Sequence, residues 1–285
     1  MAVSATPPST TPIEPSSPPR GPHRRRVVGP LFIVIVLVAG LVGVVVLDRS
    51  EESARRPPAD PAFEVPQQQV LPRSAVPQAA AIAPGGDRTT VRPTTAAVRD
   101  WATTVSEKTQ IPSRTLVAYA EAELAVRASA PECGLSWTTL AGVGRVESHH
   151  GRYGGTTIGD DGRLSPPIVG IPLDGSEGVK AIPDTDDGRL DGDVEWDRAV
   201  GAMQFLPTTW SRWGARANGD GEAPDPQNID DAALSAAKYL CASGGDLSSA
   251  DGWWRAVLTY NRSVAYGQDV FSGADAYAKA ARELG

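Results

Sequence analysis

The chain has 285 residues with 27 Lys and Arg against 34 Asp and Glu, a formal net charge of −7, and only two cysteines. The length alone would allow two domains, but the proline and apolar residues are distributed too unevenly for an even split, so we expect one folded domain. Residues 96–285 contain 17 Lys and Arg and 27 Asp and Glu, and this acidic balance argues against nucleic acid or anionic lipid as the partner of that domain, because both attract basic surfaces.

An uncharged block, VVGPLFIVIVLVAGLVGVVVL, occupies residues 27–47. At about 1.5 Å per residue it is about 30 Å long, which matches the hydrocarbon core of a bilayer, so we predict a transmembrane helix. Arg24, Arg25 and Arg26 precede it, and the positive-inside rule then places the N-terminus in the cytoplasm. A cleaved signal peptide is the alternative, but the run exceeds the usual apolar length and no small-x-small site follows it. We expect a single-pass protein of the cell membrane, with everything after Leu47 outside the cytoplasm.

Proline-rich sequence flanks this block on both sides. Runs such as TPPSTTPIEPSSPP carry few large apolar side chains, and such segments cannot bury enough surface to offset the entropy of ordering them. We therefore predict a disordered cytoplasmic tail over residues 1–26 and a disordered extracytoplasmic linker over residues 48–95.

From residue 96 to residue 285 the pattern is mainly helical. Threonines that can cap a helix open the first segment, and Val98, Trp101 and Val105 follow at helical spacing. We expect helices over residues 94–109 and 111–130, from about 136, from 207, over 228–242 and 248–261, and as a short terminal helix over 272–285.

A long segment rich in Gly, Pro and Asp, residues 155–197, interrupts the helices. Loops of this length in a compact domain are often functional. PPIVGIPL at residues 166–173 and RAVGAMQFLP at residues 198–207 could supply short strands. The expected fold is therefore α+β and mainly helical, with a small β-sheet beside a groove. The acidic run DTDDGRLDGDVEWD at residues 184–197 is typical of a solvated loop; it could host a cation, but its spacing fits no established ligand pattern.

Both cysteines, Cys133 and Cys241, follow the predicted membrane helix. Outside the cytoplasm an even pair in one domain favours a disulfide, which would close a loop of about 108 residues and contribute roughly 4 kcal/mol. Two buried free thiols are the alternative. A bridge would remove the free nucleophile that a cysteine peptidase needs.

The stretch GVGRVESHHGRYGG contains the residue that we expect to do chemistry. Glu147 shares a helix face with Trp137, Leu140 and Val143 at about 100° per residue. A carboxyl against such neighbours loses water, which raises its pKa toward neutrality and suits it to donate a proton. Gly144, one turn earlier, would leave space for a ligand.

The alternative for Glu147 is a structural one, in which it caps the helix or pairs with Arg145 or Arg152. Further stretches favour a site instead. AVGAMQFLPTTW and LTYNRSVAY supply glycine, amide and tyrosine groups, and aromatic residues recur along the domain. Sugars bind by aromatic stacking and polar hydrogen bonds, so this inventory suits a glycan groove, although any one aromatic residue is more often part of a core.

Four motifs in order carry a resemblance: ESHHGRYGG, VGAMQFLPTTW, NGDGEAPDPQNIDDA and YNRSVAY. Over residues 96–284 the chain resembles the membrane-bound lytic murein transglycosylase B-like family, which implies a lysozyme-like fold, a peptidoglycan substrate and no cofactor. The catalytic role of the family then falls on Glu147. The substrate-binding positions that we predict are Ser148, Tyr153, Met203, Gln204, Tyr260, Asn261 and Tyr266.

The resemblance implies cleavage of the β-1,4 bond between N-acetylmuramic acid and N-acetylglucosamine. Glycosidases ordinarily use two carboxylates, whereas in this family the acetamido group and the C6 hydroxyl of the muramic acid replace the second, and a 1,6-anhydro end forms without water. Glu147 would act as acid and then as base. A water-using muramidase on the same bond and a non-enzymatic wall-binding protein are the alternatives.

The loop over residues 215–230 and the two adjacent histidines contain the candidate metal ligands. Relatives can carry an EF-hand-like calcium loop where this chain has ARANGDGEAPDPQNID, and Asn218 and Asp220 are its weak candidate ligands. Arg216 falls at the first ligand position, so we expect a structural turn rather than a calcium site. His149 and His150 are adjacent and point to different sides of a helix, which does not make a zinc site. No G-x-S-x-G elbow indicates a serine hydrolase.

Overall fold

The computed structural model describes residues 62–82 and 92–284. The predicted tail over residues 1–26 and the predicted transmembrane helix over residues 27–47 lie outside these ranges. Inside them, no helix combines the length and the apolar character needed to cross a bilayer.

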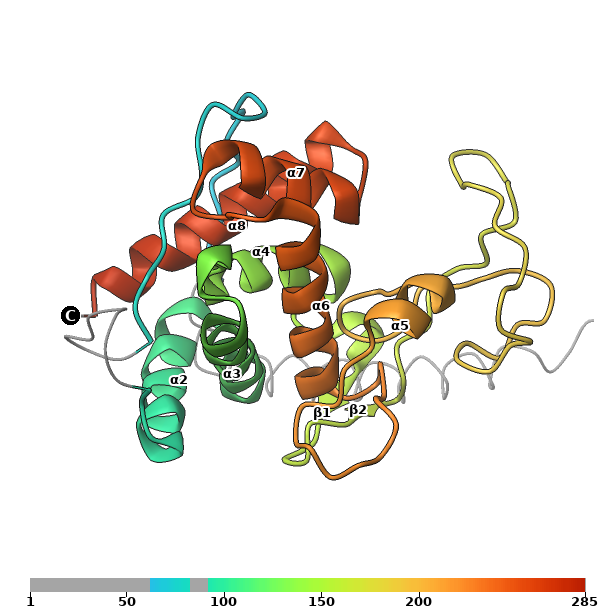
Figure 1. The fold of residues 1–285 in the computed structure, drawn as a ribbon, viewed down its shortest axis with the longest axis horizontal. Coiled ribbons are helices and arrows are strands. Elements are labelled where there is room, and N and C mark those ends of the chain that lie inside the picture. The colour runs from blue at the N-terminus through green and yellow to red at the C-terminus, as the bar shows by residue number, and fades with distance from the viewer. Residues whose placement is uncertain (1–61, 83–91, 285) are drawn as a thin grey trace, which may run out of the picture. The chain divides into compact units, whose positions relative to one another are not determined.

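Seven α-helices lie within the described part of the chain, in the order shown in Figure 1. They are α2 (Thr95–Thr109), α3 (Ser113–Ser129), α4 (Trp137–Ser148), α5 (Pro207–Trp213), α6 (Ile229–Gly244), α7 (Ala250–Tyr260) and α8 (Val264–Arg282). Two short 3-10 turns, η1 (Pro131–Cys133) and η2 (Tyr153–Gly155), flank α4. All the helices predicted between residues 94 and 285 are present.

Side-chain caps explain where most of these helices begin. The side chains of Thr94, Ser136, Asn228, Ser249 and Ser263 each accept a hydrogen bond from a backbone N–H in the first turn of α2, α4, α6, α7 and α8, respectively. Each such cap stabilises its helix by about 1 kcal/mol. The last of them makes α8 longer than the predicted terminal helix, because α8 begins directly after α7 rather than near residue 272.

Helix α4 lies at the centre of the domain, beneath α8 and beside α3 and α6 (Figure 1). Glycines bring α4 and α8 close together: a Cβ added to Gly142 would come within 2.4 Å of the Val270 carbonyl oxygen. Trp137, Leu140 and Val143 of α4 are fully buried in the core. The helix is therefore held firmly along the face that leads to Glu147.

The segment 62–82 packs on the helices, although it lies inside the predicted disordered linker. The indole N–H of Trp137 donates to Ala80 O at 3.1 Å, and that of Trp254 donates to Ala75 O at 2.9 Å. Phe63 stacks on Tyr277 with ring centroids 5.3 Å apart. Buried tryptophans thus hold an irregular segment through its carbonyl groups, and the folded unit includes residues before the expected start at residue 96.

The long segment between α4 and α5 contains one small sheet. β1 (Thr157–Ile158) and β2 (Leu164–Ser165) pair antiparallel, with Thr157 opposite Ser165. The two predicted strands over residues 166–173 and 198–207 do meet, but only through isolated bridges such as that between Val169 and Val200. A mainly helical domain with a two-stranded sheet is compatible with a lysozyme-like fold.

A disulfide joins Cys133 to Cys241, as predicted, with their Cα atoms 5.4 Å apart. Cys133 lies in η1, immediately before α4, and Cys241 lies in α6. The bridge therefore fixes the start of α4 to α6.

Candidate active site

Glu147 lies in the last turn of α4, and its side chain is half-buried. The hydroxyl of Tyr266 donates a hydrogen bond to Glu147 Oε1 at 2.6 Å. Tyr266 lies in the first turn of α8, where its backbone N–H is capped by Ser263. The early start of α8 thus brings this hydroxyl to the carboxyl group.

Burial raises the pKa of Glu147 from 4.5 to about 7, and the hydrogen bond from Tyr266 opposes that shift. Loss of water disfavours the charged carboxylate, whereas a donated hydrogen bond favours it. Since the result lies near neutrality, Glu147 is present in both protonation states at neutral pH. A group with this pKa can donate a proton and afterwards accept one.

The structural alternative for Glu147 is not favoured by its surroundings. Arg145 Nη1 donates to Asp269 O at 3.5 Å, and Arg152 Nη2 donates to Gln110 O at 3.1 Å. Within the described ranges, no ion pair involves Glu147. A carboxylate near the C-terminus of a helix also meets the negative end of the helix dipole, so it gains nothing there as a cap.

Tyr260, at the end of α7, is the second tyrosine of the site. Its hydroxyl donates to Met203 O at 2.7 Å. Burial and the nearby charge of Glu147 hold the pKa values of Tyr260 and Tyr266 well above the usual value for tyrosine. Both tyrosines therefore stay protonated near neutral pH and remain hydrogen-bond donors.

A tight turn over residues 201–204 lies against the end of α4. A Cβ on Gly201, whose φ is 76°, would come within 1.9 Å of the Pro226 carbonyl oxygen, so only glycine fits there. Gln204 also has a positive φ, 46°, and its Nε2 donates to Gly201 O at 2.9 Å. Ser148 Oγ donates to Ala202 O at 2.6 Å, which joins the turn to α4.

The predicted substrate-binding residues thus fall into three groups. Tyr260, Tyr266 and Gln204 surround Glu147 or the turn beside it. Ser148 and Met203 are fully buried, so they support the site from within. The side chains of Tyr153 and Asn261 are exposed, and in the part of the chain that is described no hydrogen bond joins them to Glu147. Their substrate contacts remain predictions.

A buried polar chain around His150 was not predicted. His150 Nδ1 lies 3.4 Å from the Tyr119 hydroxyl, and His150 Nε2 lies 2.9 Å from the Tyr277 hydroxyl. Burial, with Arg152 and other neighbouring cations, lowers the pKa of His150 to about 3, so the ring is neutral. The pairing depends on residues from α3 and α8, and no local motif indicates it.

The prediction that Gly144 leaves room for a ligand is wrong. A Cβ at this position would lie 1.9 Å from the Tyr119 hydroxyl oxygen and 3.4 Å from Met203 Sδ. The protein itself fills the space. Gly144 is small because a buried tyrosine from α3 packs against α4 here.

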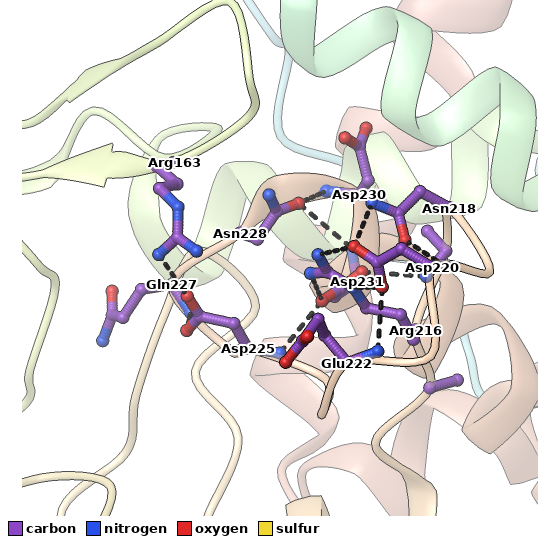
Figure 2. A network of polar contacts seen from close by, with 12 residues as sticks. Arg163, Arg216, Asn218, Asp220, Glu222, Asp225, Gln227, Asn228, Asp230 and Asp231 are labelled. Carbon is purple, nitrogen blue, oxygen red and sulfur yellow. Dashed lines mark hydrogen bonds and ion pairs between the residues drawn. The ribbon is translucent and has the colours of Figure 1, made fainter.

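The candidate calcium loop forms a polar network around an arginine (Figure 2). Arg216 donates to both oxygens of Asp220 at 2.8 and 2.6 Å and to Asp231 Oδ2 at 2.8 Å. Asn218 Nδ2 also donates to Asp220, at 2.9 Å. The guanidinium group supplies the positive charge that a cation would otherwise bring, and the arrangement is that of a structural turn.

A cavity of about 970 Å³ lies elsewhere in the domain, between α2, α3 and α6. Charged pairs form part of its wall, including that between Arg114 and Asp230, and Glu147 is not among the lining residues. The predicted glycan groove beside Glu147 therefore stays a prediction.

Comparison with known families adds independent information. Residues 188–249 match the model of the family described as Transglycosylase SLT domain. The matched span includes the turn over residues 201–204, α5 and α6, and it ends before α7. Comparisons with curated proteins and with solved structures gave no match. The family match supports a lytic transglycosylase domain, and hence a peptidoglycan substrate, at a general level.

Proposed function

We propose that this protein is a lytic transglycosylase that cleaves the β-1,4 bond between N-acetylmuramic acid and N-acetylglucosamine, with Glu147 as its acid and then its base. The observation that carries the proposal is the environment of the Glu147 carboxyl group. This group is half-buried and accepts a hydrogen bond from Tyr266, and its pKa is raised to about 7. The family match over residues 188–249 supports the same class of reaction.

The reaction begins with the protonated form of Glu147. Its proton passes to the bridging oxygen as the bond from C1 of the muramic acid to that oxygen breaks, and the acetamido oxygen of the same sugar stabilises C1. The C6 hydroxyl then attacks C1 and gives its proton to the Glu147 carboxylate. The product has a 1,6-anhydro end, no water is consumed, and the acid is regenerated for the next cycle.

The resemblance favours this route over hydrolysis. Glycosidases that use water or a protein nucleophile need a second carboxylate about 5–9 Å from the acid. The four motifs assign a catalytic role to one carboxylate only, that of Glu147. A substrate-assisted mechanism requires only one acidic side chain.

The finer assignments belong to this proposal too. We place the protein in the membrane-bound lytic murein transglycosylase B-like family because the four motifs occur in its order. The domain would lie outside the cytoplasm, anchored by residues 27–47 at the cell membrane, where peptidoglycan is within its reach. The disulfide between Cys133 and Cys241 is consistent with an oxidising compartment.

Digestion of purified peptidoglycan by the full chain tests the proposal, with product masses as the readout. A transglycosylase releases muropeptides lighter by one water than those of a muramidase. Glu147→Gln should reduce digestion by at least about 100-fold, the scale of general acid catalysis, while the variant still binds the insoluble glycan. Glu107→Gln, which changes an exposed glutamate of α2, is the matched control and should digest normally.

Three results would contradict the proposal. Undiminished digestion by the Glu147→Gln variant would remove this residue from the mechanism. Products with hydrated reducing ends would leave the residue in place but would change the reaction to hydrolysis. Binding without any cleavage by the wild-type chain would favour the wall-binding alternative.

A further inference from the structure

The acidic loop, residues 184–197, gathers carboxylates that are far apart in its sequence. Asp184, Asp186 and Asp197 each place one potential ligand atom within 4.8 Å of those of the other two. We propose that these three side chains bind one calcium ion. The site is separate from Glu147 and from the network around Arg216, and it does not depend on the proposed reaction.

One oxygen of this cluster has no partner. Asp186 Oδ2 accepts a hydrogen bond from the backbone N–H of Leu190 at 3.1 Å. Asp186 Oδ1 is buried, and it has no hydrogen-bond partner in the described part of the protein. Both oxygens belong to one carboxyl group, so Oδ1 lies in or at the edge of the cluster. Buried polar atoms are nearly always paired in native proteins, and an orphaned carboxylate oxygen indicates a missing ligand.

Asp197 supports the same conclusion, because it is fully buried without a cation. Its two oxygens accept hydrogen bonds from the backbone and hydroxyl of Thr185 at 2.9 Å, which are neutral donors. The next residue, Arg198, is turned to Asp193 and to Gly170 O instead. A buried carboxylate normally has a countercharge or a metal ion.

No arginine or lysine takes the place of a metal ion here. Arg189 is near enough for its charge to act on Asp186, but within the described ranges no ion pair joins any cationic side chain to Asp184, Asp186 or Asp197. The loop around Arg216 is the contrast, since its carboxylates already have a guanidinium group between them. The two acidic loops thus differ in whether the protein supplies the positive charge.

The ligand atoms select a hard divalent cation. All three are carboxylate oxygens, and zinc prefers sites with nitrogen or sulfur ligands. Calcium binds six to eight oxygens at about 2.4 Å, so two ligands on opposite sides of the ion are about 4.8 Å apart. The three aspartate oxygens lie no farther apart than this, and backbone carbonyls or water would complete the shell.

Calcium at this place would connect the loop to the segment that leads to the candidate active site. The backbone N–H of Asp197 donates to Ile182 O at 3.0 Å, and Asp197 O accepts from the N–H of Leu173 at 3.1 Å. Three residues later, Val200 exchanges backbone hydrogen bonds with Phe205 around the turn of residues 201–204. The acidic loop extends away from the helices beyond α5 (Figure 1).

The test is calcium binding to the full chain after treatment with a chelator, measured by titration calorimetry and by terbium luminescence excited through Trp196, which adjoins Asp197. We expect one site. Asp186→Asn should weaken binding at least about tenfold, because charge count sets calcium affinity in such loops. Asp187→Asn is the matched control: this exposed residue of the same loop lies outside the cluster, and its change should leave affinity unaltered.

Three outcomes would overturn the proposal. The first is no binding by the wild-type chain at millimolar calcium. The second is equal weakening by Asp186→Asn and Asp187→Asn, which would indicate a diffuse charge effect. The third is loss of binding in Asp220→Asn with normal binding in Asp186→Asn, which would place the ion in the other loop. Melting curves check whether each variant folds. If Asp186→Asn does not fold, Asp184→Asn is used in its place. Since the readout is binding, failure of glycan cleavage would not affect it.

Discussion

Replacing Glu147 by Gln tests the buried acid through protein stability, independently of activity. The pKa of this carboxyl is raised from 4.5 to about 7 in the folded state, chiefly by burial. Because the folded value is the higher one, the stability that the protonated side chain contributes is complete below pH 4.5 and is lost as the pH rises through 7. The difference between the two pKa values corresponds to about 3 kcal/mol at most. Glutamine is neutral at every pH and can still accept the hydrogen bond from Tyr266.

The Glu147→Gln variant should therefore be more stable than the wild type at pH 8, by about 1–3 kcal/mol, and nearly equal to it at pH 4.5. Denaturant unfolding of the full chain at the two pH values, followed by tryptophan fluorescence, measures the difference. Glu107→Gln controls for the loss of one charge and should show no such pH dependence. Equal stabilities of the Glu147→Gln variant and the wild type at pH 8 would show that Glu147 is well solvated, and the argument for a dehydrated acid would fail.

Three further predictions concern Tyr266, the disulfide and Gly144. Glu147 must be protonated to start the reaction, so its pKa sets the alkaline limb of the pH–activity profile. Tyr266→Phe removes the hydrogen bond that opposes the raised pKa, so this alkaline limb should move upward by about one pH unit. Tyr239→Phe, which removes a hydroxyl hydrogen-bonded to a backbone carbonyl, should leave the profile in place, and an unmoved profile in the first variant would refute the assignment. Replacing Cys133 and Cys241 together by Ser should lower the free energy of unfolding by roughly 4 kcal/mol, measured by denaturant unfolding, and a change below about 1 kcal/mol would show that the bridge adds little. Gly144→Ala should cost about 1–3 kcal/mol because its Cβ would overlap a buried tyrosine hydroxyl; a neutral effect in a melting experiment would mean that the tyrosine can move away.

The sequence was sufficient for the features that depend on local chemistry. Capping residues and apolar spacing placed α2, α3, α4 and α6 almost at their observed bounds, because a cap and a periodic face are encoded within a few neighbouring residues. The disulfide was predicted from an even count of cysteines and from the predicted location outside the cytoplasm. The partial burial of Glu147 was predictable because its inward position is a property of the helix that contains it.

Features that depend on contacts between distant segments were not predictable in this way. The packing of residues 62–82 depends on indole N–H groups that lie 57 and 179 residues further along the chain. Proline-rich composition indicated a linker, and composition does not report which carbonyl groups a later tryptophan will bind. The cluster in the acidic loop was missed for a related reason: Asp197 joins Asp184 and Asp186 only after the loop folds back on itself.

The hydrogen bond between Tyr266 and Glu147 spans 119 residues, and it explains why one carboxyl can serve both steps of the proposed reaction. Burial alone would raise the pKa further, and the carboxyl group would then be a weaker acid that gives its proton to the leaving oxygen less readily. A solvated carboxylate with its ordinary pKa would rarely hold the proton that the leaving oxygen needs. The tyrosine hydroxyl stabilises the anion, so the two effects balance near pH 7. Glu147 lies in α4 and its donor Tyr266 lies in α8, so the close packing of these two helices at Gly142 helps to hold the donor against the carboxyl group.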